Sequence, residues 1–522
     1  MVQQPPAAEN GDPIARQAGS VSTVEISLTD DDPTQILDAV LRRVLTALHP
    51  AGPRVTAAGP QTARIDLEGG ACLQLTVGEA APAAAHSPGT HLLVLSVLRR
   101  GQLSAAQEAN LTEALRQVPF TAAELREVAQ QMPLTLGLAE RITDAPLAGS
   151  VLLIMAHYLE DLSGMLDGAT RLGARAETLV VVEKGYPYRS RDRVVAHLRD
   201  RGIVSFHSSR ITDALAHQSA VARRLGLKPV IIDDGGYALP ALIESMPEQL
   251  AACAGLVEQT MSGIFKLEPY ADRLALPIFS VAQSHIKGTI ESYWIADAAV
   301  RRILDLMPPH KVEGQPALVI GYGQVGSEIA RVLQGLRMRV AVFDRELMRL
   351  VVAHEAGYVT HNDLTRLIEH HRPLLIVGAT GRQALTEDDL SALPAETFLA
   401  SVTSRDGEFP LSLLSEMAHT VLDEGTTGTT YVLGHGTSVT VLANGFPVNF
   451  HYAESVRNRH SDLTLASLLV GACTLARDGH GFSNGHNVER TDEVLHDSRL
   501  LADYYDRYGP SLPAPLTAKD TP

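Results

Sequence analysis

ALVIGYGQVG, at residues 317–326, is the stretch that decides the fold of the central part of the chain. An apolar run, Ala317–Ile320, ends in the pattern G-x-G-x-x-G, and a helix-like segment, Ser327–Gly335, follows it. In this pattern the first glycine permits a tight turn, the second lets a pyrophosphate approach the backbone, and the third lets the helix pack on the strand. The context of strand, loop and helix therefore predicts a Rossmann-type dinucleotide-binding unit, with the helix N-terminus facing the phosphates. The loop residues predicted to contact the cofactor are Gly321, Gly323, Gln324, Val325 and Gly326.

A carboxylate follows at the place that selects the cofactor. The next predicted strand, Arg339–Phe343, ends in Asp344, 18 residues after Gly326. An acid here accepts hydrogen bonds from the adenosine ribose hydroxyls and repels a 2′-phosphate. NAD is therefore predicted in preference to NADP, although Arg339 and Arg345 lie close enough to leave NADP open.

Outside this unit, short apolar runs alternate with helical stretches. This alternation predicts parallel sheets with helices on both faces. A long predicted helix, Glu291–Leu306, joins the two α/β parts, and a further helix is predicted at Leu463–Ala476. The predicted strands are Val151–Met155, Leu179–Val182, Ile203–Phe206, Val230–Ile232, Leu374–Val377 and Phe398–Val402.

The N-terminal part has a different pattern, typical of a small α+β module. Two alternating runs, Ala63–Leu67 and Cys72–Val77, predict a hairpin around Gly69-Gly70. No chemistry-bearing motif is apparent in this module, so its role stays open. The other predicted elements are strands Val24–Leu28 and His91–Val97 and helices Thr34–Leu48, with acidic caps at Asp30–Asp32, and Ser104–Val118.

The predicted fold class is α/β: a Rossmann-type NAD domain inserted in an α/β substrate domain, with the α+β module in front. The predicted parts are a polar tail at 1–20, the module at 21–118, the substrate domain at 119–296 completed by about 456–480, the NAD domain at 297–455, and a tail at 481–522.

Composition excludes several classes of function. The chain has 522 residues and a formal net charge of −16, which disfavours nucleic acid as a partner. Three distant cysteines, with no CxxC pair, argue against a disulfide framework and fit a reducing cytosol. No signal-like start and no membrane-length apolar run is apparent. We therefore expect a cytoplasmic protein without a membrane partner.

Other catalytic patterns are lacking in the sequence. There is no G-x-x-x-x-G-K-[ST], G-x-S-x-G or H-E-x-x-H pattern. The loop Gly479–His486 carries two histidines but no obvious carboxylate or thiolate beside them, so no metal site is predicted. His370-His371 ends a predicted helix, where the dipole favours a histidine.

From about residue 125 to 475 the chain resembles the S-adenosylhomocysteine hydrolases. The segments IDDGG at 232–236 and VEQTMSG at 257–263 resemble the family's DDGG and SEETTTG motifs at matching separation. Ala156-His157 followed by 172–174 resembles its histidine-bearing helix start, and the 321–326 loop is close to its own. The segments LANG at 442–445 and Val448-Asn449 resemble its LAEGRLVNL segment.

The resemblance implies tightly held NAD that transiently oxidises a ribose hydroxyl, with elimination and addition of a thiol or water at the neighbouring positions. His157 and Asp234 stand where the family has its histidine and aspartate. A helix-capping or surface histidine, and turn-capping by Asp233 and Asp234, are the alternatives. Thr260, Thr380 and Asn449 complete the predicted NAD contacts.

Several substitutions depart from the family pattern. Gln259 stands at the family's catalytic glutamate, and a glutamine can bind a hydroxyl but cannot take a proton. The family's lysine falls on Ala282, its aspartate on Ile286, its asparagine on Lys287 and its cysteine on Glu291. Thr260 keeps one NAD-contacting threonine, whereas the next two are Met261 and Ser262. The histidine after the family's LVN segment, and its C-terminal lysine and tyrosine, have no clear equivalents.

New titratable groups stand nearby. Lys287, which could replace the lost lysine, joins His157, Asp234 and Gln259 as a candidate catalytic residue. His285, Glu291 and His451 are further candidates, and Arg189 and Arg191 could meet an anionic group. Plain solvated or structural use is the alternative for each.

Three functions remain open. The first is an enzyme with an altered site that transiently oxidises a nucleoside-like or related alcohol. The second is unaltered hydrolysis of S-adenosylhomocysteine, and the third is a non-catalytic NAD-binding regulatory protein. A small-molecule substrate and, by resemblance, a homo-oligomer are expected.

Overall fold

The computed structural model describes residues 21–28, 33–79, 91–101, 103–117, 120–309, 311–403, 407–434, 436–453, 455–456 and 458–509. The predicted tail at 1–20 and the caps at Asp30–Asp32 lie outside these residues. The chain forms two units: residues 1–130 with 191–201, and residues 131–190 with 202–522. Each unit is described by itself below.

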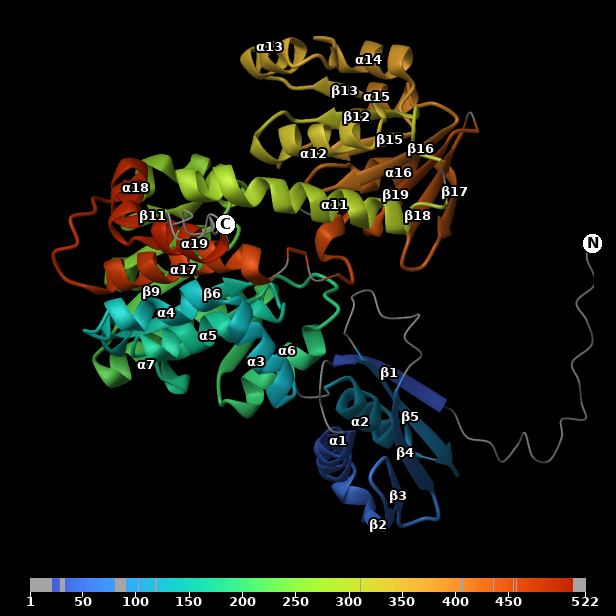
Figure 1. Cartoon of the computed structure of the whole chain (residues 1–522), viewed down its shortest axis with the longest axis vertical. Coiled ribbons are helices and arrows are strands. Elements are labelled where there is room, and N and C mark those ends of the chain that lie inside the picture. The colour runs from blue at the N-terminus through green and yellow to red at the C-terminus, as the bar shows by residue number, and fades with distance from the viewer. Residues whose placement is uncertain are drawn as a thin grey trace, which may run out of the picture. The chain divides into compact units, whose positions relative to one another are not determined.

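An antiparallel sheet forms the centre of the N-terminal unit (Figure 1). Its strand order is β1-β5-β4-β3-β2. Every second side chain of β3 and β4, such as Ile65 and Leu75, is buried against apolar residues of helices α1 and α2, such as Val44 and Leu111. The alternation that predicted the hairpin therefore reflects one covered face. The elements are β1 (Val21–Leu28), α1 (Pro33–Ala47), β2 (Arg54–Ala58), β3 (Thr62–Asp66), β4 (Cys72–Glu79), β5 (His91–Arg100) and α2 (Ala105–Arg116).

The sequence analysis did not predict strand β2. All five of its residues are exposed, and it pairs with β3 at the edge of the sheet. An edge strand with neither face buried has no alternation to detect. Helices α3 (Ala122–Gln131) and α6 (Arg191–Asp200) also contribute to this unit, joined by an ion pair between Glu124 and Arg193 at 2.6 Å.

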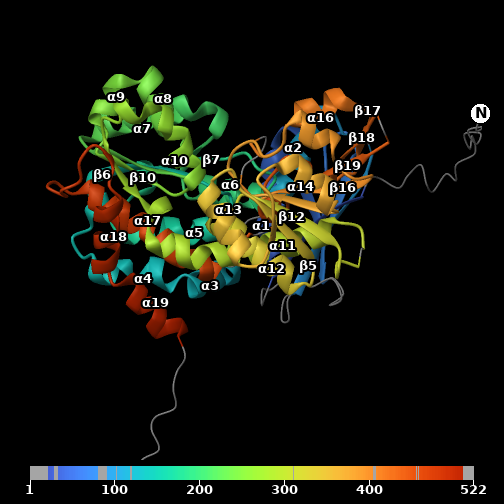
Figure 2. The ribbon, with the colours of Figure 1, turned by 90° about the horizontal axis from the view of Figure 1, so that it is seen from above.

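A parallel sheet forms the first half of the second unit. In the described part of the chain its order is β20-β11-β10-β9-β6-β7-β8. Helices α7, α8 and α9 cover one face, and α17, α4 and α5 lie on the other (Figure 2). The strands are β6 (Ser150–Ala156), β7 (Leu179–Glu183), β8 (Val204–His207), β9 (Lys228–Asp233), β10 (Gly255–Glu258), β11 (Pro277–Ser280) and β20 (Gly485–His486). The helices are α4 (Pro133–Arg141), α5 (Asp161–Arg171), α7 (Ile211–Leu225), α8 (Ala238–Ser245), α9 (Pro247–Ala252), α10 (Met261–Leu267), α17 (Asn458–Ala476), α18 (Val488–Asp497) and α19 (Leu500–Tyr508).

A second sheet carries the dinucleotide loop. Its order is β14-β13-β12-β15-β16-β19-β18-β17, parallel through β19 and antiparallel from there to β17. Helices α11 and α12 pack on one face, and α14, α15 and α16 on the other. The strands are β12 (Pro316–Ile320), β13 (Arg339–Phe343), β14 (Val359–Thr360), β15 (Leu375–Gly378), β16 (Glu396–Ser401), β17 (Ala418–Asp423), β18 (Gly428–Leu433) and β19 (Ser438–Leu442). The helices are α11 (Ser292–Leu306), α12 (Gln324–Gly335), α13 (Leu347–Glu355), α14 (Leu364–His371), α15 (Glu387–Ser391) and α16 (Leu411–Met417).

The chain enters the second sheet through α11 and returns to the first through α17. Strand β20 then pairs with β11, 205 residues or more earlier in the chain, so one domain is inserted in the other. The predicted α/β fold class is confirmed. Among the described residues, no helix is long and apolar enough to cross a membrane.

Candidate functional site

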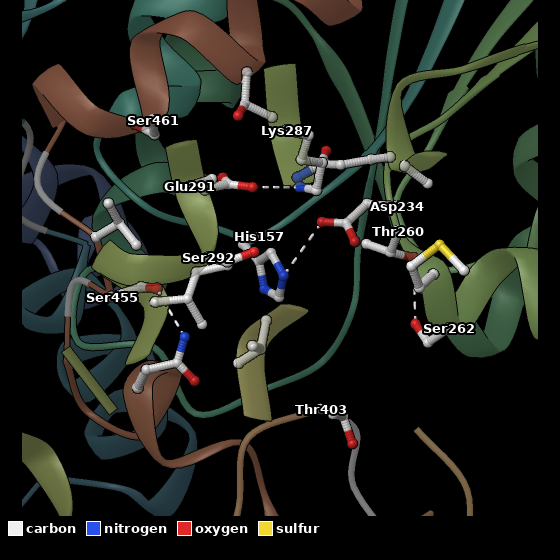
Figure 3. A pocket seen from close by; sticks show the side chains of 18 of the residues that line it. His157, Asp234, Thr260, Ser262, Lys287, Glu291, Ser292, Thr403, Ser455 and Ser461 are labelled. Carbon is white, nitrogen blue, oxygen red and sulfur yellow. Dashed lines mark hydrogen bonds and ion pairs between the residues drawn. The ribbon is translucent and has the colours of Figure 1, made fainter. Parts of the chain in front are cut away.

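A cavity of about 510 Å³ in the second unit is lined by residues of both sheets (Figure 3). His157, Asp234 and Gln259 follow β6, β9 and β10, and therefore meet at the carboxyl edge of the first sheet. Gly323 and Gln324 of the dinucleotide loop line the same cavity. All four predicted catalytic residues, including Lys287, thus come together with the loop.

The glycines of the loop have the distinct roles that the pattern predicts. Gly321 has a φ of +97°, and a Cβ there would lie 2.7 Å from the carbonyl oxygen of Ala379. A Cβ at Gly326 would lie 1.9 Å from the carbonyl oxygen of Gly321. At Gly323, by contrast, the nearest described atom is Nη1 of Arg349 at 3.6 Å. Gly321 and Gly326 therefore allow close packing, while Gly323 leaves open space beside the backbone.

Asp344 fixes the loop through hydrogen bonds to backbone N–H groups. Its carboxylate accepts a hydrogen bond from Tyr322 N at 2.6 Å and from Glu346 N at 2.8 Å. Arg349 lies 4.0 Å from the same carboxylate. Gly321, Gly326 and Asp344 do not line the cavity wall, whereas Gly323, Gln324, Val325, Thr260, Thr380 and Asn449 do.

Two of the predicted NAD contacts, Thr380 and Asn449, are held by hydrogen bonds to neighbouring side chains. Glu408 accepts hydrogen bonds from Thr380 N at 2.8 Å and Gly381 N at 2.6 Å, which fixes the turn after β15. Asn449 donates through Nδ2 to Ser455 Oγ at 3.0 Å. Its Oδ1 is buried without a hydrogen-bond partner among the described residues. The open backbone at Gly323 and this acceptor fit a bound dinucleotide with an amide group.

A cluster of hydrogen-bonded polar side chains forms another part of the cavity lining. Asp234 Oδ2 lies 3.2 Å from His157 Nε2, and Asp234 Oδ1 accepts a hydrogen bond from Lys184 Nζ at 2.8 Å. Lys184 Nζ also lies 3.4 Å from His157 Nε2, and Tyr188 Oη lies 2.7 Å from His157 Nδ1. The structure does not support the surface-histidine alternative for His157, because its side chain is only 13% exposed and lies within a hydrogen-bonded cluster.

Burial and charge set the protonation of this cluster. Burial lowers the pKa of His157 to about 3, and Lys184 and Lys287 act in the same direction against Asp234. Burial opposes ionisation of Asp234, but Lys184 and His157 outweigh it and lower the pKa of that carboxyl. Burial also disfavours the Lys184 cation, yet Asp234 more than compensates and raises its pKa. Near neutral pH the cluster thus holds an ammonium, a carboxylate and an uncharged imidazole.

Aromatic rings enclose the imidazole. The Phe450 ring stacks on His157 with centroids 3.8 Å apart, and Tyr188 meets it edge-on at 5.5 Å. Tyr186 lies 5.6 Å from the His157 ring and packs on Phe446. These rings exclude water from one side of the cluster, which strengthens the interactions among its charges.

The adjacent aspartates divide their roles. Asp233 Oδ2 accepts a hydrogen bond from Ala238 N at 2.7 Å, so the turn-capping interpretation holds for Asp233. Asp234 instead turns into the cavity, beside His157 (Figure 3). Glu258 lies next to Asp233 in the strand register and bonds Thr260 N at 2.9 Å and Gly235 N. Asp233 and Glu258 therefore form a pair of neighbouring carboxyls. Both are fully buried, and burial raises the pKa of each.

The remaining candidates separate into those inside and those outside the cavity. Lys287 Nζ pairs with Glu291 Oε2 at 2.6 Å, and both line the cavity on the π-helical turn before α11. His285 is instead almost fully exposed, with Asp492 as its partner at 2.8 Å. His451 bonds the carbonyl oxygen of Thr426 and does not line the cavity.

The basic loop does not reach the cavity either. Arg189 is exposed, and neither it nor Arg191 lines the cavity. Arg191 pairs with its neighbour Asp192 at 3.0 Å.

Lys184 lines the cavity and contacts Asp234, and sequence reasoning missed it. It follows β7 directly, and β7 lies beside β6 at the same edge that carries His157. That position after an apolar run was a usable signal, because polar residues at the carboxyl ends of adjacent parallel strands gather at one edge. Among the described residues, no group of three or more histidine, cysteine, aspartate or glutamate side chains is arranged to hold a metal ion.

Comparison with known proteins identifies the NAD-binding domain and relatives of most of the chain. Residues 292–455 match the family model described as S-adenosyl-L-homocysteine hydrolase, NAD binding domain, so the inserted domain binds NAD. An adenosylhomocysteinase of Thermotoga maritima is 26% identical over 352 residues, covering 65% of this chain and 83% of its own. One from Haloquadratum walsbyi is 26% identical over 318 residues, covering 60% and 70%.

Two further similarities are less informative. An uncharacterized protein of Mycobacterium tuberculosis is 28% identical over 342 residues, covering 62% of this chain and 64% of its own. A solved dipicolinate synthase structure from Bacillus halodurans is 15% identical, covers 64% of this chain and 100% of its own, and has a TM-score of 0.39. Residues 292–455 thus belong to the S-adenosyl-L-homocysteine hydrolase NAD-binding domain family, and 60–65% of the chain is similar to adenosylhomocysteinases at 26% identity.

Proposed function

We propose that the protein is an NAD-dependent enzyme of the adenosylhomocysteinase type with an altered active site. Its substrate is a nucleoside-like or related alcohol, which it oxidises transiently. The observation that carries the proposal is a single cavity lined both by the dinucleotide loop, at Gly323 and Gln324, and by the cluster of His157, Asp234 and Lys184.

The cofactor side of the proposal rests on the loop geometry. Gly323 and the first turn of α12 receive the pyrophosphate, and Asp344 receives the adenosine ribose. Thr260, Thr380 and Asn449 line the cavity beyond the loop, where Asn449 Oδ1 can accept a hydrogen bond from an amide. Bound NAD supplies a hydride acceptor for the carbon that bears the substrate hydroxyl.

The cluster supplies orientation and charge. Asp234 stays ionised and can accept a hydrogen bond from a substrate hydroxyl, while Lys184 holds that carboxylate in place at 2.8 Å. His157 is uncharged and packed between Phe450 and Tyr188, so it forms a rigid wall beside Asp234. Rigid polar groups in a water-excluded site favour charge development on a bound oxygen.

The altered chemistry rests on Gln259 and Ala282. Both line the cavity, at positions where the family resemblance expects a glutamate and a lysine. The Gln259 amide can donate to and accept from a hydroxyl, but it does not accept a proton. Ala282 offers a methyl group only. We therefore propose a substrate range that differs from S-adenosylhomocysteine hydrolysis.

Absorbance spectroscopy tests the proposal. The cofactor is extracted from purified protein and identified, and spectra are recorded with adenosine, S-adenosylhomocysteine and a panel of nucleosides and sugar alcohols. We expect bound NAD and growth of a reduced-nicotinamide band near roughly 340 nm with at least one alcohol. The Asp234→Asn variant should keep NAD but lose the band.

The other outcomes separate the alternatives. Full turnover of S-adenosylhomocysteine would favour unaltered family chemistry. Bound NAD that no alcohol in the panel reduces would favour a non-catalytic, NAD-binding regulatory protein. Lack of any dinucleotide binding would overturn the proposal as a whole.

A further inference from the structure

A lysine occupies the centre of the cluster without any part in the resemblance to the family. Lys184 lies directly after β7, and its side chain is 7% exposed. It lines the cavity, donates to Asp234 Oδ1 at 2.8 Å and lies 3.4 Å from His157 Nε2. Burying an ammonium is costly, so a lysine is retained in such a place when its charge is used or paired.

The other nearby lysines are engaged elsewhere. Lys287 is held by Glu291 at 2.6 Å, on a different element. Lys266 donates to Gly235 O at 2.8 Å and lies 4.0 Å from the Tyr237 ring centroid, and it does not line the cavity. Lys184 is therefore the described lysine that contacts both Asp234 and His157.

One arrangement of protons satisfies the three shortest polar contacts of the cluster. Tyr188 O–H donates to His157 Nδ1, His157 Nε2–H donates to Asp234 Oδ2, and Lys184 donates to Asp234 Oδ1. Both ring nitrogens of His157 are then occupied inside the protein. The ammonium of Lys184 has three N–H groups, one of which bonds Asp234, so donors remain for a ligand.

We propose that Lys184 is the ammonium group that binds the reacting oxygen of the substrate, supplied from β7 in place of a lysine at Ala282. Its positive charge also opposes protonation of the His157 ring, in the same direction as burial, and so favours this proton arrangement of the cluster. This role rests on the proposed function, because it concerns the same cavity and the same alcohol substrate.

The charged and polar groups around His157 determine how its pKa changes when the Lys184 charge is removed. His157 faces Lys184, Asp234 and Lys287 as charged groups, with Tyr188 as hydrogen-bond partner. Lys184 faces Asp234, Tyr186 and Tyr237. Without the Lys184 ammonium, Asp234 attracts a proton to His157 with less opposition, so the imidazole protonates at higher pH.

The test compares Lys184→Met, which removes the charge, with Lys184→Arg, which keeps it. Lys228→Met is the matched control, since Lys228 is a half-exposed lysine paired with Asp478 and remote from the cavity lining. Two quantities are measured on the full chain with NAD bound. One is the titration of His157, followed by NMR of histidine-labelled protein with His157→Gln to assign the signal. The other is the rate at which an alcohol that reduces the wild-type cofactor builds the nicotinamide band.

We expect Lys184→Met to raise the pKa of His157 by about one unit or more, although burial still holds it below the ordinary value. The band should form about 100-fold more slowly in this variant. Added methylamine should restore part of the rate in Lys184→Ala, whose cavity has room for a small amine. Lys184→Arg should keep the His157 titration close to that of wild type, and Lys228→Met should change neither quantity.

An unchanged His157 titration and an unchanged rate in folded Lys184→Met would overturn the proposal while leaving the proposed function intact. If no alcohol reduces the wild-type cofactor, the proposed function fails, and with it the substrate-binding role of Lys184. The NMR titration still reports separately on whether Lys184 lowers the pKa of His157. Thermal unfolding and NAD content show whether each variant is folded.

Discussion

Two buried carboxylates at adjacent strand ends illustrate how single residues divide their tasks. Asp233 and Glu258 point into the protein, where they hold the turns that follow β9 and β10. Their oxygens Asp233 Oδ1 and Glu258 Oε2 are buried without hydrogen-bond partners among the described residues. Ionising both carboxyls in a dry site is costly, so the pair retains a proton.

This pair predicts a pH dependence of stability. The pKa of Glu258 is raised by burial, then by Asp233, so its contribution to stability is fully present below the unfolded pKa near 4.5. It is lost as pH rises through the raised folded pKa. Glu258→Gln, which stays neutral, should therefore reduce the fall in melting temperature above pH 4.5. The measurement is thermal unfolding across pH, with Glu313→Gln at an exposed carboxylate as control. Equal pH dependence in both variants would show that the pair carries no proton.

The loop glycines give a matched pair of substitutions. Gly326→Ala places a Cβ 1.9 Å from Gly321 O and should lower the unfolding free energy by about 3 kcal/mol. Gly323→Ala meets Arg349 Nη1 at 3.6 Å and should leave stability nearly unchanged. Its methyl group should instead obstruct the pyrophosphate and weaken the free energy of NAD binding by about 1–3 kcal/mol, which corresponds to about 5- to 150-fold in affinity.

Denaturant unfolding and NAD titration check both variants. A Gly323→Ala protein with normal NAD affinity would show that the pyrophosphate lies elsewhere.

At the scale of elements, helix α4 depends on a distant helix for its cap. The residue before it, Met132, makes no side-chain cap, and Pro133 begins the helix. Asp462 of α17 accepts hydrogen bonds from Leu134 N at 2.8 Å and Thr135 N at 2.9 Å. A carboxylate at a helix N-terminus satisfies orphan N–H groups and interacts favourably with the dipole.

Removing this cap has a measurable cost. Asp462→Ala leaves two buried N–H groups without their acceptor and should lower the unfolding free energy by about 2–4 kcal/mol. Asp462→Asn keeps one acceptor oxygen and should lose less. Urea unfolding of the full chain measures both, and a loss in the alanine variant no larger than in Asn458→Ala, at the start of α17, would contradict the capping role.

The burial of each element explains whether the sequence predicted it. Fully buried parallel strands such as β6 and β12 appear as unbroken apolar runs, and the structure confirms both within a residue or two. The predicted helix beginning at Glu291 is preceded by a π-helical turn, Lys287–Glu291, which the local sequence does not reveal. That turn places Lys287 and Glu291 on the cavity, so a small irregularity changes which side chains reach the site.

For the whole molecule, the cavity couples the two sheets of the second unit. A ligand that binds the folded state but not the unfolded chain stabilises it by mass action, by about 2.7 kcal/mol at one hundred times the dissociation constant. Stripping NAD should therefore lower the melting temperature, and adding NAD back should restore it. NADP should restore less, because Asp344 repels a 2′-phosphate. Equal recovery with both nucleotides would show that Asp344 does not select the cofactor.

The sequence by itself determined the cofactor loop, the strand ends that carry His157 and Asp234, and the α/β fold. These are local signals: glycines whose spacing serves one turn, and apolar runs whose length and period follow from burial in a parallel sheet. The candidates His157, Asp234, Gln259 and Lys287 therefore line one cavity together with Gly323, Gln324 and Val325 of the loop.

Only the tertiary structure decided which side chains form the cluster. It brings Lys184 to Asp234, directs Asp233 to the turn before α8 and Asp234 into the cavity, and leaves His285 and His451 outside the cavity. These outcomes depend on rotamers and turns that are set by packing between segments far apart in the chain. A pattern of residue types carries no record of such packing, because the same lysine after the same strand could equally face solvent.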